Sequence, residues 1–247
     1  MKITKVTLTG ADDSIKDPTQ LVQLSEQFPF VEWGILLSRN NKGSARFPSE
    51  QWLSDLSFWR HHRSWPRINF SGHLCGAYVR ALLMGSDAWS YEDGIRYMWR
   101  FFRRLQINTH GMDHDYDMKG LVSVINKYPE IEFIFQYDNR NTEILAGVVA
   151  AGCKNVSTLF DLSGGAGLLP NEWPLPLHNV KCGYAGGLSP ANVGAQIATI
   201  AEKVGDREIW IDMETHVRSN NDQLFDLEKC KQVLTICRGT ELIQEQI

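Results

Sequence analysis

Two patterns of hydrophobic and polar positions alternate along this chain, one typical of strands and one typical of helices. Short apolar runs bounded by turn residues predict strands, and longer amphipathic stretches predict helices. Strands are expected at residues 3–10, 31–38, 68–76, 103–111, 131–138, 155–164, 180–187 and 207–217. Helices are expected to begin near Pro48 and at Ala77, and to cover residues 87–102, 141–152, 189–204 and 225–237.

Eight strand–helix alternations within 247 residues predict one closed barrel. Alternating strands and helices are typical of a parallel sheet, and about 250 residues is the usual length of a (β/α)8 barrel. No Pro- or Ser-rich linker divides the chain, so residues 1–247 are expected to form one domain. The expected fold is therefore α/β, a single (β/α)8 TIM barrel; an open, doubly wound sheet is the alternative.

The composition is that of an ordinary globular protein, with 43% hydrophobic and 22% charged residues. The formal net charge of −4 gives no basic surface for nucleic acid, and no apolar run reaches the roughly 18 residues of a membrane span. The basic stretch at residues 60–63 is expected to be a solvated helix end. No nucleic-acid partner, membrane partner or cofactor is therefore expected, and the oligomeric state is left open.

The cysteines favour a reducing compartment. They are odd in number, widely spaced and include no Cys-x-x-Cys pair, which is typical of reduced thiols. The first residues, MKITKVTLTG, alternate like a strand and lack the apolar core of a secretory signal. Both observations favour a cytoplasmic protein.

Two glycine-rich turns each follow a predicted strand, at residues 159–167 (LFDLSGGAG) and 182–193 (CGYAGGLSPANV). Glycine lets backbone N–H groups approach a ligand closely, and a helix N-terminus favours an anion. Ser189 is the expected N-cap of the helix after the second turn. The turns predict a phosphate site at the carboxyl ends of the strands, where barrels carry their function. Its candidate residues are Ser163, Gly164, Gly165, Gly167, Gly186 and Gly187.

Polar side chains also lie at the predicted strand ends, which indicates a polar pocket. Asn108 and Gln136 are candidates for substrate binding. Asp161 can act as a general acid or base, or it can cap the loop that follows it. Asp212 and Glu214 are two residues apart, so both side chains point to the barrel interior. They are expected to bind substrate hydroxyl groups or to pair with Arg46 or Arg218.

Two further clusters carry possible metal or nucleophilic chemistry. His73 and Cys75 share one face of a strand, and they are either a Cys–His or metal site or simply packed side chains. The segment 110–115 contains two histidines and two aspartates, and it is either a cation site or a solvated polar loop.

In the order of its motifs, the chain resembles the phosphoribosylanthranilate isomerase family. AGGLSPANV (185–193) looks like that family's strand-7 phosphate turn, and FDLSGGAG (160–167) looks like its strand-6 aspartate and glycine turn. WIDMETHV (210–217), GSARFPSEQW (43–52) and VTLTG (6–10) are similar to its strand-8, strand-2 and strand-1 segments. Residues 55–150 carry no resemblance.

The resemblance implies roles for several residues. Asp161 takes the place of the family's general acid, Arg46 that of its substrate-binding arginine, and the glycine turns hold the phosphate. Thr9 stands where the family has its catalytic cysteine base, and Glu214 and Thr215 stand where it has phosphate-binding Ser-Gly. A threonine hydroxyl does not replace a thiolate without a partner, so Glu214 or His73 is the expected substitute base.

Three functions follow as expectations. The first is an isomerase or related proton-transfer enzyme acting on a phosphosugar or another phosphorylated small molecule. The second is a catalytically silent barrel that binds a phosphometabolite. The third is a metal-assisted aldolase or hydrolase that uses His73, Cys75, Asp212 and Glu214.

Overall fold

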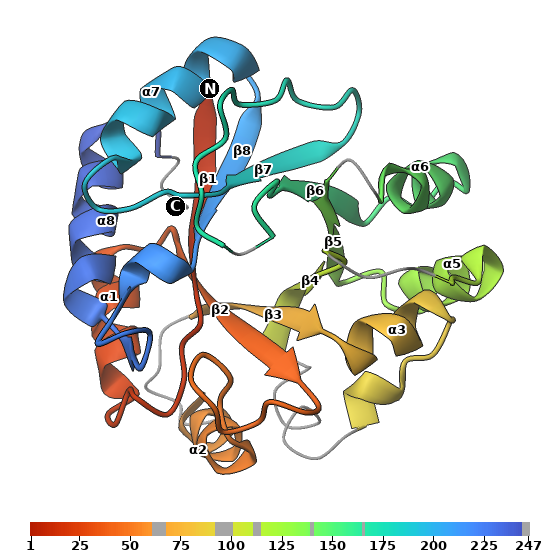
Figure 1. The fold of residues 1–247 in the computed structure, drawn as a ribbon, viewed down its shortest axis with the longest axis horizontal. Helices are drawn as coiled ribbons and strands as arrows, with labels where there is room; N and C mark the ends of the chain where they lie inside the picture. Colours follow the sequence, from red (N-terminus) through yellow and green to blue (C-terminus); the bar gives the residue numbers. More distant parts are fainter. Residues whose placement is uncertain (61–67, 92–100, 111–114, 139–140, 165, 244–247) are drawn as a thin grey trace.

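The computed structural model is a closed barrel of eight parallel strands (Figure 1) and describes residues 1–60, 68–91, 101–110, 115–138, 141–164 and 166–243. The strands are β1 (Lys2–Thr9), β2 (Val31–Ser38), β3 (Asn69–Cys75), β4 (Phe102–Ile107), β5 (Glu132–Tyr137), β6 (Val156–Phe160), β7 (Lys181–Ala185) and β8 (Glu208–Met213). They pair in chain order, and β1 closes the ring by pairing with β8. The predicted single barrel is therefore confirmed, and the open sheet is wrong.

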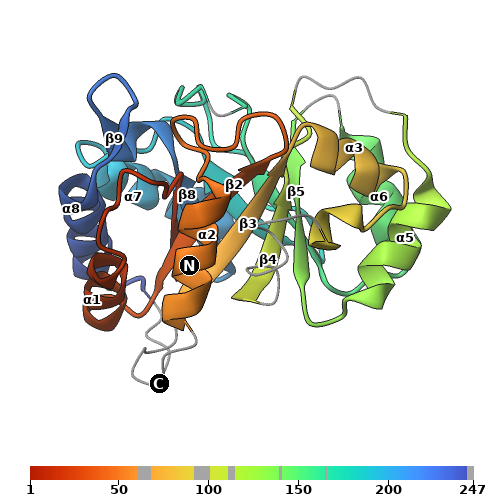
Figure 2. The same cartoon turned by 90° about the horizontal axis from the view of Figure 1, so that it is seen from below.

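Helices surround the strands, with α1 and α8 on one side of the barrel and α3, α5 and α6 on the other (Figures 1 and 2). They are α1 (Thr19–Gln27), α2 (Glu50–Arg60), α3 (Ala77–Leu83), α5 (Met118–Lys127), α6 (Thr142–Ala150), α7 (Val193–Val204) and α8 (Leu227–Gly239). None of these described helices is long and apolar enough to cross a membrane.

The connection between β6 and β7 departs from the expected eight strand–helix alternations. Its described residues within 161–180 contain no helix, and Figure 1 shows the segment as an irregular loop. Glycines and three prolines (Pro170, Pro174 and Pro176) explain this, because proline removes a helical hydrogen bond and glycine weakens a helix. Within the expected helix at 87–102, the described residues include the 3-10 helix η1 (Ala88–Tyr91), and residues 92–100 lie outside the described chain.

Several element ends differ from the predictions. Helix α7 begins at Val193 with Asn192 as its N-cap residue, and the backbone carbonyl of Ser189 accepts hydrogen bonds from the N–H groups of both residues. The predicted strands 103–111, 155–164 and 207–217 end earlier, at Ile107, Phe160 and Met213. After Met213 the chain forms the 3-10 helix η3 (Thr215–Val217) and a small hairpin of β9 (Arg218–Ser219) and β10 (Leu224–Phe225).

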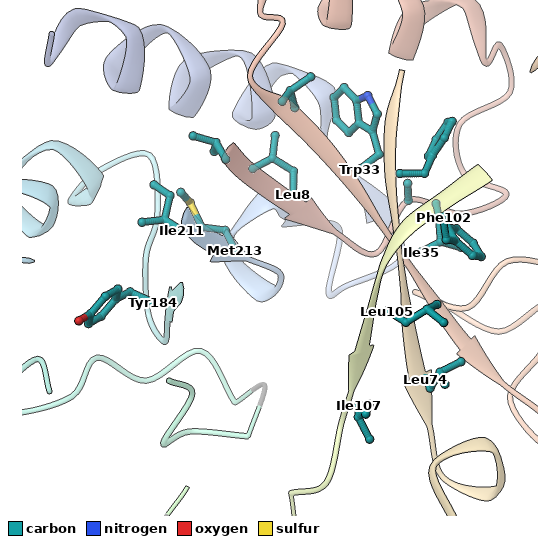
Figure 3. Close-up of a cluster of buried hydrophobic side chains, with 14 of the residues drawn as sticks. Leu8, Trp33, Ile35, Leu74, Phe102, Leu105, Ile107, Tyr184, Ile211 and Met213 are labelled. Atoms are coloured by element: carbon teal, nitrogen blue, oxygen red, sulfur yellow. The ribbon is translucent and has the colours of Figure 1, made fainter. Parts of the chain in front are cut away.

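Most of the hydrophobic core lies between the strands and the helices. Leu8, Trp33, Ile35, Leu105 and Ile211 are among the fully buried side chains on the outer face of the strands (Figure 3). This layer follows from the period of two in a strand, which sends alternate residues outward.

The barrel interior holds a smaller apolar cluster of Ile134, Leu159 and Trp210. Trp210 fills the centre, and it needs Gly183 opposite, because a Cβ there would lie 2.1 Å from the indole. The guanidinium of Arg104 lies 4.2 Å from the indole centroid, from the amino-end side of the strands. Arg104 also binds Glu32 at 2.7 Å and Glu132 at 3.1 Å. Arg104, Glu32, Glu132 and Trp210 are called the barrel floor below.

Candidate active site

Two adjoining cavities lie at the carboxyl ends of the strands. The smaller, called the recess, measures about 40 Å³ and is walled by the glycine turns after β6 and β7 and by the start of η3. The larger, called the chamber, measures about 360 Å³, within the usual size range of a small-molecule site. Gln106, Asp161 and Glu214 line both cavities. A ligand that spans the two cavities would therefore contact both carboxylates.

Asp161 follows β6 and is held by hydrogen bonds on both oxygens. Its Oδ1 accepts from the backbone N–H of Ser163 at 3.2 Å and from the Ser163 hydroxyl at 2.9 Å. Its Oδ2 accepts from Nε2 of Gln136 at 2.9 Å. The carboxylate thus forms the expected loop turn and also lines both cavities.

Asp212 lies deeper, where β8 faces β1 and β3. Its Oδ1 accepts a hydrogen bond of 2.8 Å from the Thr9 hydroxyl. Burial raises the pKa of Asp212 well above its ordinary value, and the nearby charges of Glu214 and Glu32 act in the same direction. The Thr9 proton is therefore directed at Asp212, which fixes the orientation of that carboxyl group.

His73 lies beside Asp212 in the barrel interior, with Nε2 3.1 Å from the Ser71 hydroxyl and 3.9 Å from Oδ2 of Asp212. Burial, with the positive charge of Arg104, lowers the pKa of His73 to about 3. The imidazole is therefore neutral at neutral pH and poorly placed to take up a proton.

Glu214 follows β8 and binds the guanidinium of Arg46, with Oε1 2.5 Å from Nη1. Arg46 also binds Asp222 through Nε, and its own N–H donates to Asp12 at 2.8 Å. Burial raises the pKa of Glu214, although Arg46 opposes this shift. The expected pairing of Glu214 with Arg46 is thus observed, whereas Arg218 pairs with Asp12 and Asp222.

Cys75 and Asn108 meet at the edge of the chamber, where Nδ2 of Asn108 donates to the Cys75 sulfur at 3.3 Å. Burial raises the pKa of the Cys75 thiol to about 12, so no thiolate forms at neutral pH. Among the described residues, no three His, Cys, Asp or Glu side chains are grouped to hold a metal ion. Residues 111–114 of the polar segment 110–115 lie outside the described chain.

The glycine turns are closely packed. Gly187 has φ +63°, and a Cβ there would lie 2.4 Å from the backbone nitrogen of Leu169. Gly186 has φ +117° and approaches the Leu168 carbonyl in the same way. These two glycines therefore let the β6–β7 connection lie against the β7 turn and close the wall of the recess.

The other predicted glycines differ in their surroundings. Gly167 has φ +69°, lies beside Thr215, and accepts a contact of 2.9 Å from the His216 ring through its carbonyl. Gly164 lies in the chamber wall under the ring of His110. Gly165 lies outside the described residues.

Several residues of the cavities were not among the predicted site residues, and three of them are polar groups that bear on the site. Gln106 of β4 is buried, its Nε2 donates to Asn108, and its Oε1 has no hydrogen-bond partner among the described residues. Arg80 of α3 and His110 after β4 line the chamber. Gln106 could have been found, because it lies two residues before Asn108 and shares its face of the strand.

No protein-family model matches this chain, and no curated protein sequence matches it. Solved structures do resemble it. A monomeric form of the dimeric phosphoribosylanthranilate isomerase of Thermotoga maritima has a TM-score of 0.55 at 16% identity, over 96% of this chain and 100% of that one. The isomerase of the same name from Pyrococcus furiosus gives 0.53 at 12% identity, over 96% and 99%.

A third solved structure, described as native KDPGal, has a TM-score of 0.50 at 11% identity and covers 98% of this chain and 97% of that one. Identities this low establish a shared fold, and one barrel fold hosts many unrelated reactions. The chain is therefore an α/β barrel of the TIM type, structurally similar to phosphoribosylanthranilate isomerases.

Proposed function

We propose that this protein is an enzyme that transfers protons on a phosphorylated small molecule, in the manner of a phosphosugar isomerase. The observation that carries the proposal is that Asp161 and Glu214 line both the glycine-walled recess and the chamber. A phosphate in the recess would place the carbon atoms next to it between these carboxylates. Ser163, Gly186 and Gly187 are the proposed phosphate contacts.

The acid–base roles follow from the surroundings of each group. Glu214 is the proposed base, because a raised pKa makes a carboxylate a better proton acceptor near neutral pH. Asp161 is the proposed carrier of the proton to the carbonyl oxygen. Thr9 is proposed to orient Asp212, since its hydroxyl donates a hydrogen bond to that carboxyl group. The proposal gives His73 no proton-transfer role.

The substrate would be an aldose or ketose phosphate. Removing the proton next to its carbonyl group and protonating the oxygen gives an enediol, and the reverse at the neighbouring carbon gives the isomer. Gln136 and Asn108 are proposed to bind substrate hydroxyl groups in the chamber, which both residues line. Arg46 would contact the substrate on the side of Glu214.

Ligand binding tests the proposal first. At about ten times its Kd, a ligand stabilises the native state by about 1.4 kcal/mol, or about 3–6 °C for a domain of this size. We expect ribose 5-phosphate to raise the melting temperature by this amount. We also expect the protein to exchange a carbon-bound proton of this sugar in D2O, as measured by proton NMR. A reduced analogue of the phosphoribosylanthranilate isomerase product tests the narrower resemblance. Absence of a shift with every compound would refute a phosphosugar site.

A matched glycine pair tests the recess. Gly187 and Gly205 share φ +63°, but a Cβ at Gly205 meets no atom within 4 Å. We expect Gly205→Ala to cost about 1–3 kcal/mol through backbone strain alone and to keep the ribose 5-phosphate shift. Gly187→Ala should destabilise further and lose that shift, measured by thermal melting with and without the ligand. Equal ligand shifts in the two variants would place the phosphate elsewhere.

A second candidate is a barrel that binds the phosphorylated compound without turnover. The ion pairs of Arg46 with Glu214 and Asp222 favour this second candidate. They occupy the proposed base with the arginine that is proposed to bind the substrate. Stabilisation by ribose 5-phosphate without any proton exchange would select this candidate.

A further inference from the structure

His110 and Asp138 form a pair at the edge of the chamber. Nδ1 of His110 lies 3.2 Å from Oδ2 of Asp138. The histidine follows β4 and the aspartate follows β5, so adjacent strands bring the two side chains together. The Asp138 side chain is 7% exposed and the His110 side chain is 41% exposed. A buried carboxylate therefore holds an imidazole that remains open to the cavity.

Neighbouring residues hold both members of the pair in place. Asp138 accepts the Asn141 N–H through Oδ1 at 3.2 Å, and its own N–H donates to Oδ1 of Asn141 at 3.1 Å. The backbone N–H of His110 donates to Oε1 of Gln136 at 3.2 Å. Since Gln136 also donates to Asp161, one amide connects the histidine backbone to the proposed acid.

The absence of a side chain at Gly164 leaves room for the imidazole ring of His110. A Cβ on Gly164 would lie 2.1 Å from Cδ2 of His110, so the ring occupies space that any other residue would fill. His110 lines the chamber with Asp161 and Glu214. Among the described residues, no hydrogen bond reaches its Nε2, and this nitrogen is left available to a ligand.

We propose that His110 is a further acid–base residue of this site, held by Asp138 as the Nδ1–H tautomer with Nε2 as the proton acceptor. Its expected partner is the hydroxyl group next to the carbonyl of a hydroxy-carbonyl substrate. The assignment rests on the proposed isomerase function. A carboxylate that binds Nδ1–H leaves the Nε2 lone pair free, and imidazole readily exchanges protons near neutral pH.

The proposed isomerisation passes through an enediol and conserves protons and electrons. Glu214 takes the carbon-bound proton, the C–H electrons form C=C, and the carbonyl oxygen takes a proton from Asp161 to complete the enediol. His110 then takes the proton of the second hydroxyl through Nε2, and the freed electron pair forms the new C=O. The C=C electrons then take up a proton from Glu214 at the former carbonyl carbon. Water exchange returns a proton to Asp161 and removes one from His110.

Two measurements on the full chain test the inference. In nitrogen–proton NMR correlations of the histidine side chains, the signals lost in His110→Gln should be those of an Nδ1–H tautomer. In D2O, wild-type protein should both deuterate and isomerise at least one of ribose 5-phosphate, arabinose 5-phosphate and glucose 6-phosphate. His110→Gln should lower isomerisation by about 100-fold or more while carbon-bound deuteration persists. His110→Ala should recover isomerisation with added imidazole.

His178→Gln is the matched control, because this histidine precedes β7 at the opposite end of the barrel and lines neither cavity. It should match the wild type. An Nε2–H tautomer for His110, or full isomerisation by His110→Gln, overturns the inference and leaves the proposed function standing. A wild-type protein that neither deuterates nor isomerises the three sugars overturns the proposed function and this inference with it.

Discussion

Replacing Asp161 by asparagine is expected to lower the rate of carbon-bound proton exchange on ribose 5-phosphate by about 100- to 10,000-fold, the usual contribution of a general acid or base. Asparagine keeps a side-chain oxygen that can accept from Ser163, so the turn after β6 is preserved. It removes the carboxyl group, held by Gln136 at the cavity wall, that is proposed to protonate the carbonyl oxygen of the substrate. Proton NMR of the sugar in D2O measures the rate.

Asp117→Asn is the control for that variant. Asp117 accepts the N–H of Lys119, two residues later, at 3.0 Å, which is the same local turn that Asp161 makes with Ser163. Asp117 lines neither cavity, so its variant should lose some stability and keep the exchange rate. Near-wild-type exchange by Asp161→Asn would restrict Asp161 to its structural role in the turn.

Replacing Arg104 by methionine is expected to lower the free energy of unfolding by about 3–5 kcal/mol, the usual cost of breaking a buried ion pair. The change leaves Glu32 and Glu132 in the barrel floor without their guanidinium partner. It also removes the contact of Arg104 with the Trp210 ring. Denaturant unfolding at neutral pH measures the loss.

Arg103→Met separates this effect from a general loss of charge, because Arg103 is exposed on the outer face of the same strand. It should change the unfolding free energy by no more than about 0.5 kcal/mol. An equally small change in unfolding free energy for Arg104→Met would contradict this prediction. It would mean that Glu32 and Glu132 move or become protonated at no cost in stability.

Low pH should reduce the difference in unfolding free energy between the wild-type protein and Arg104→Met. Burial raises the pKa of Glu132, but Arg104, Ser157 and Lys181 more than offset this, so the pKa lies below its ordinary value. A lowered carboxylate pKa stabilises the fold above the ordinary value, and that stability is lost as pH falls through the folded-state pKa. The Arg104→Met variant lacks the part of this pKa shift that Arg104 causes. Only the wild-type protein therefore loses the corresponding part of its unfolding free energy as the pH falls.

The sequence was sufficient to predict the barrel because its strands and helices are local patterns. Strand β2 was predicted with both ends correct, and the others to within a few residues at their amino ends. The expectation of eight strand–helix alternations was wrong after β6, where the glycine and proline residues that oppose a helix are visible in the sequence. The start of α7 was placed too early because Ser189 and Asn192 are both good N-cap residues, and only the folded turn distinguishes them.

The geometry of the candidate site could be predicted less well because its contacts join distant parts of the chain. The alternation in β8 correctly placed Asp212 toward the interior, but its partner Thr9 is 203 residues away. Pairing of Arg46 with Glu214 was an open alternative, whereas the engagement of Asp222 by the same guanidinium was not foreseen. His110 was recognised only as part of a segment expected to be a cation site or a solvated polar loop, because its partner Asp138 follows the next strand.

The indole of Trp210 has a kinetic consequence. Packed against Gly183 and Arg104, it fills the barrel centre, and in the described part of the chain both cavities are lined from the carboxyl ends of the strands. In the proposed isomerase, the reactant and its product would therefore bind through the same opening of the barrel. Accumulated product would then compete with the reactant, and turnover would depend on the rate at which product leaves.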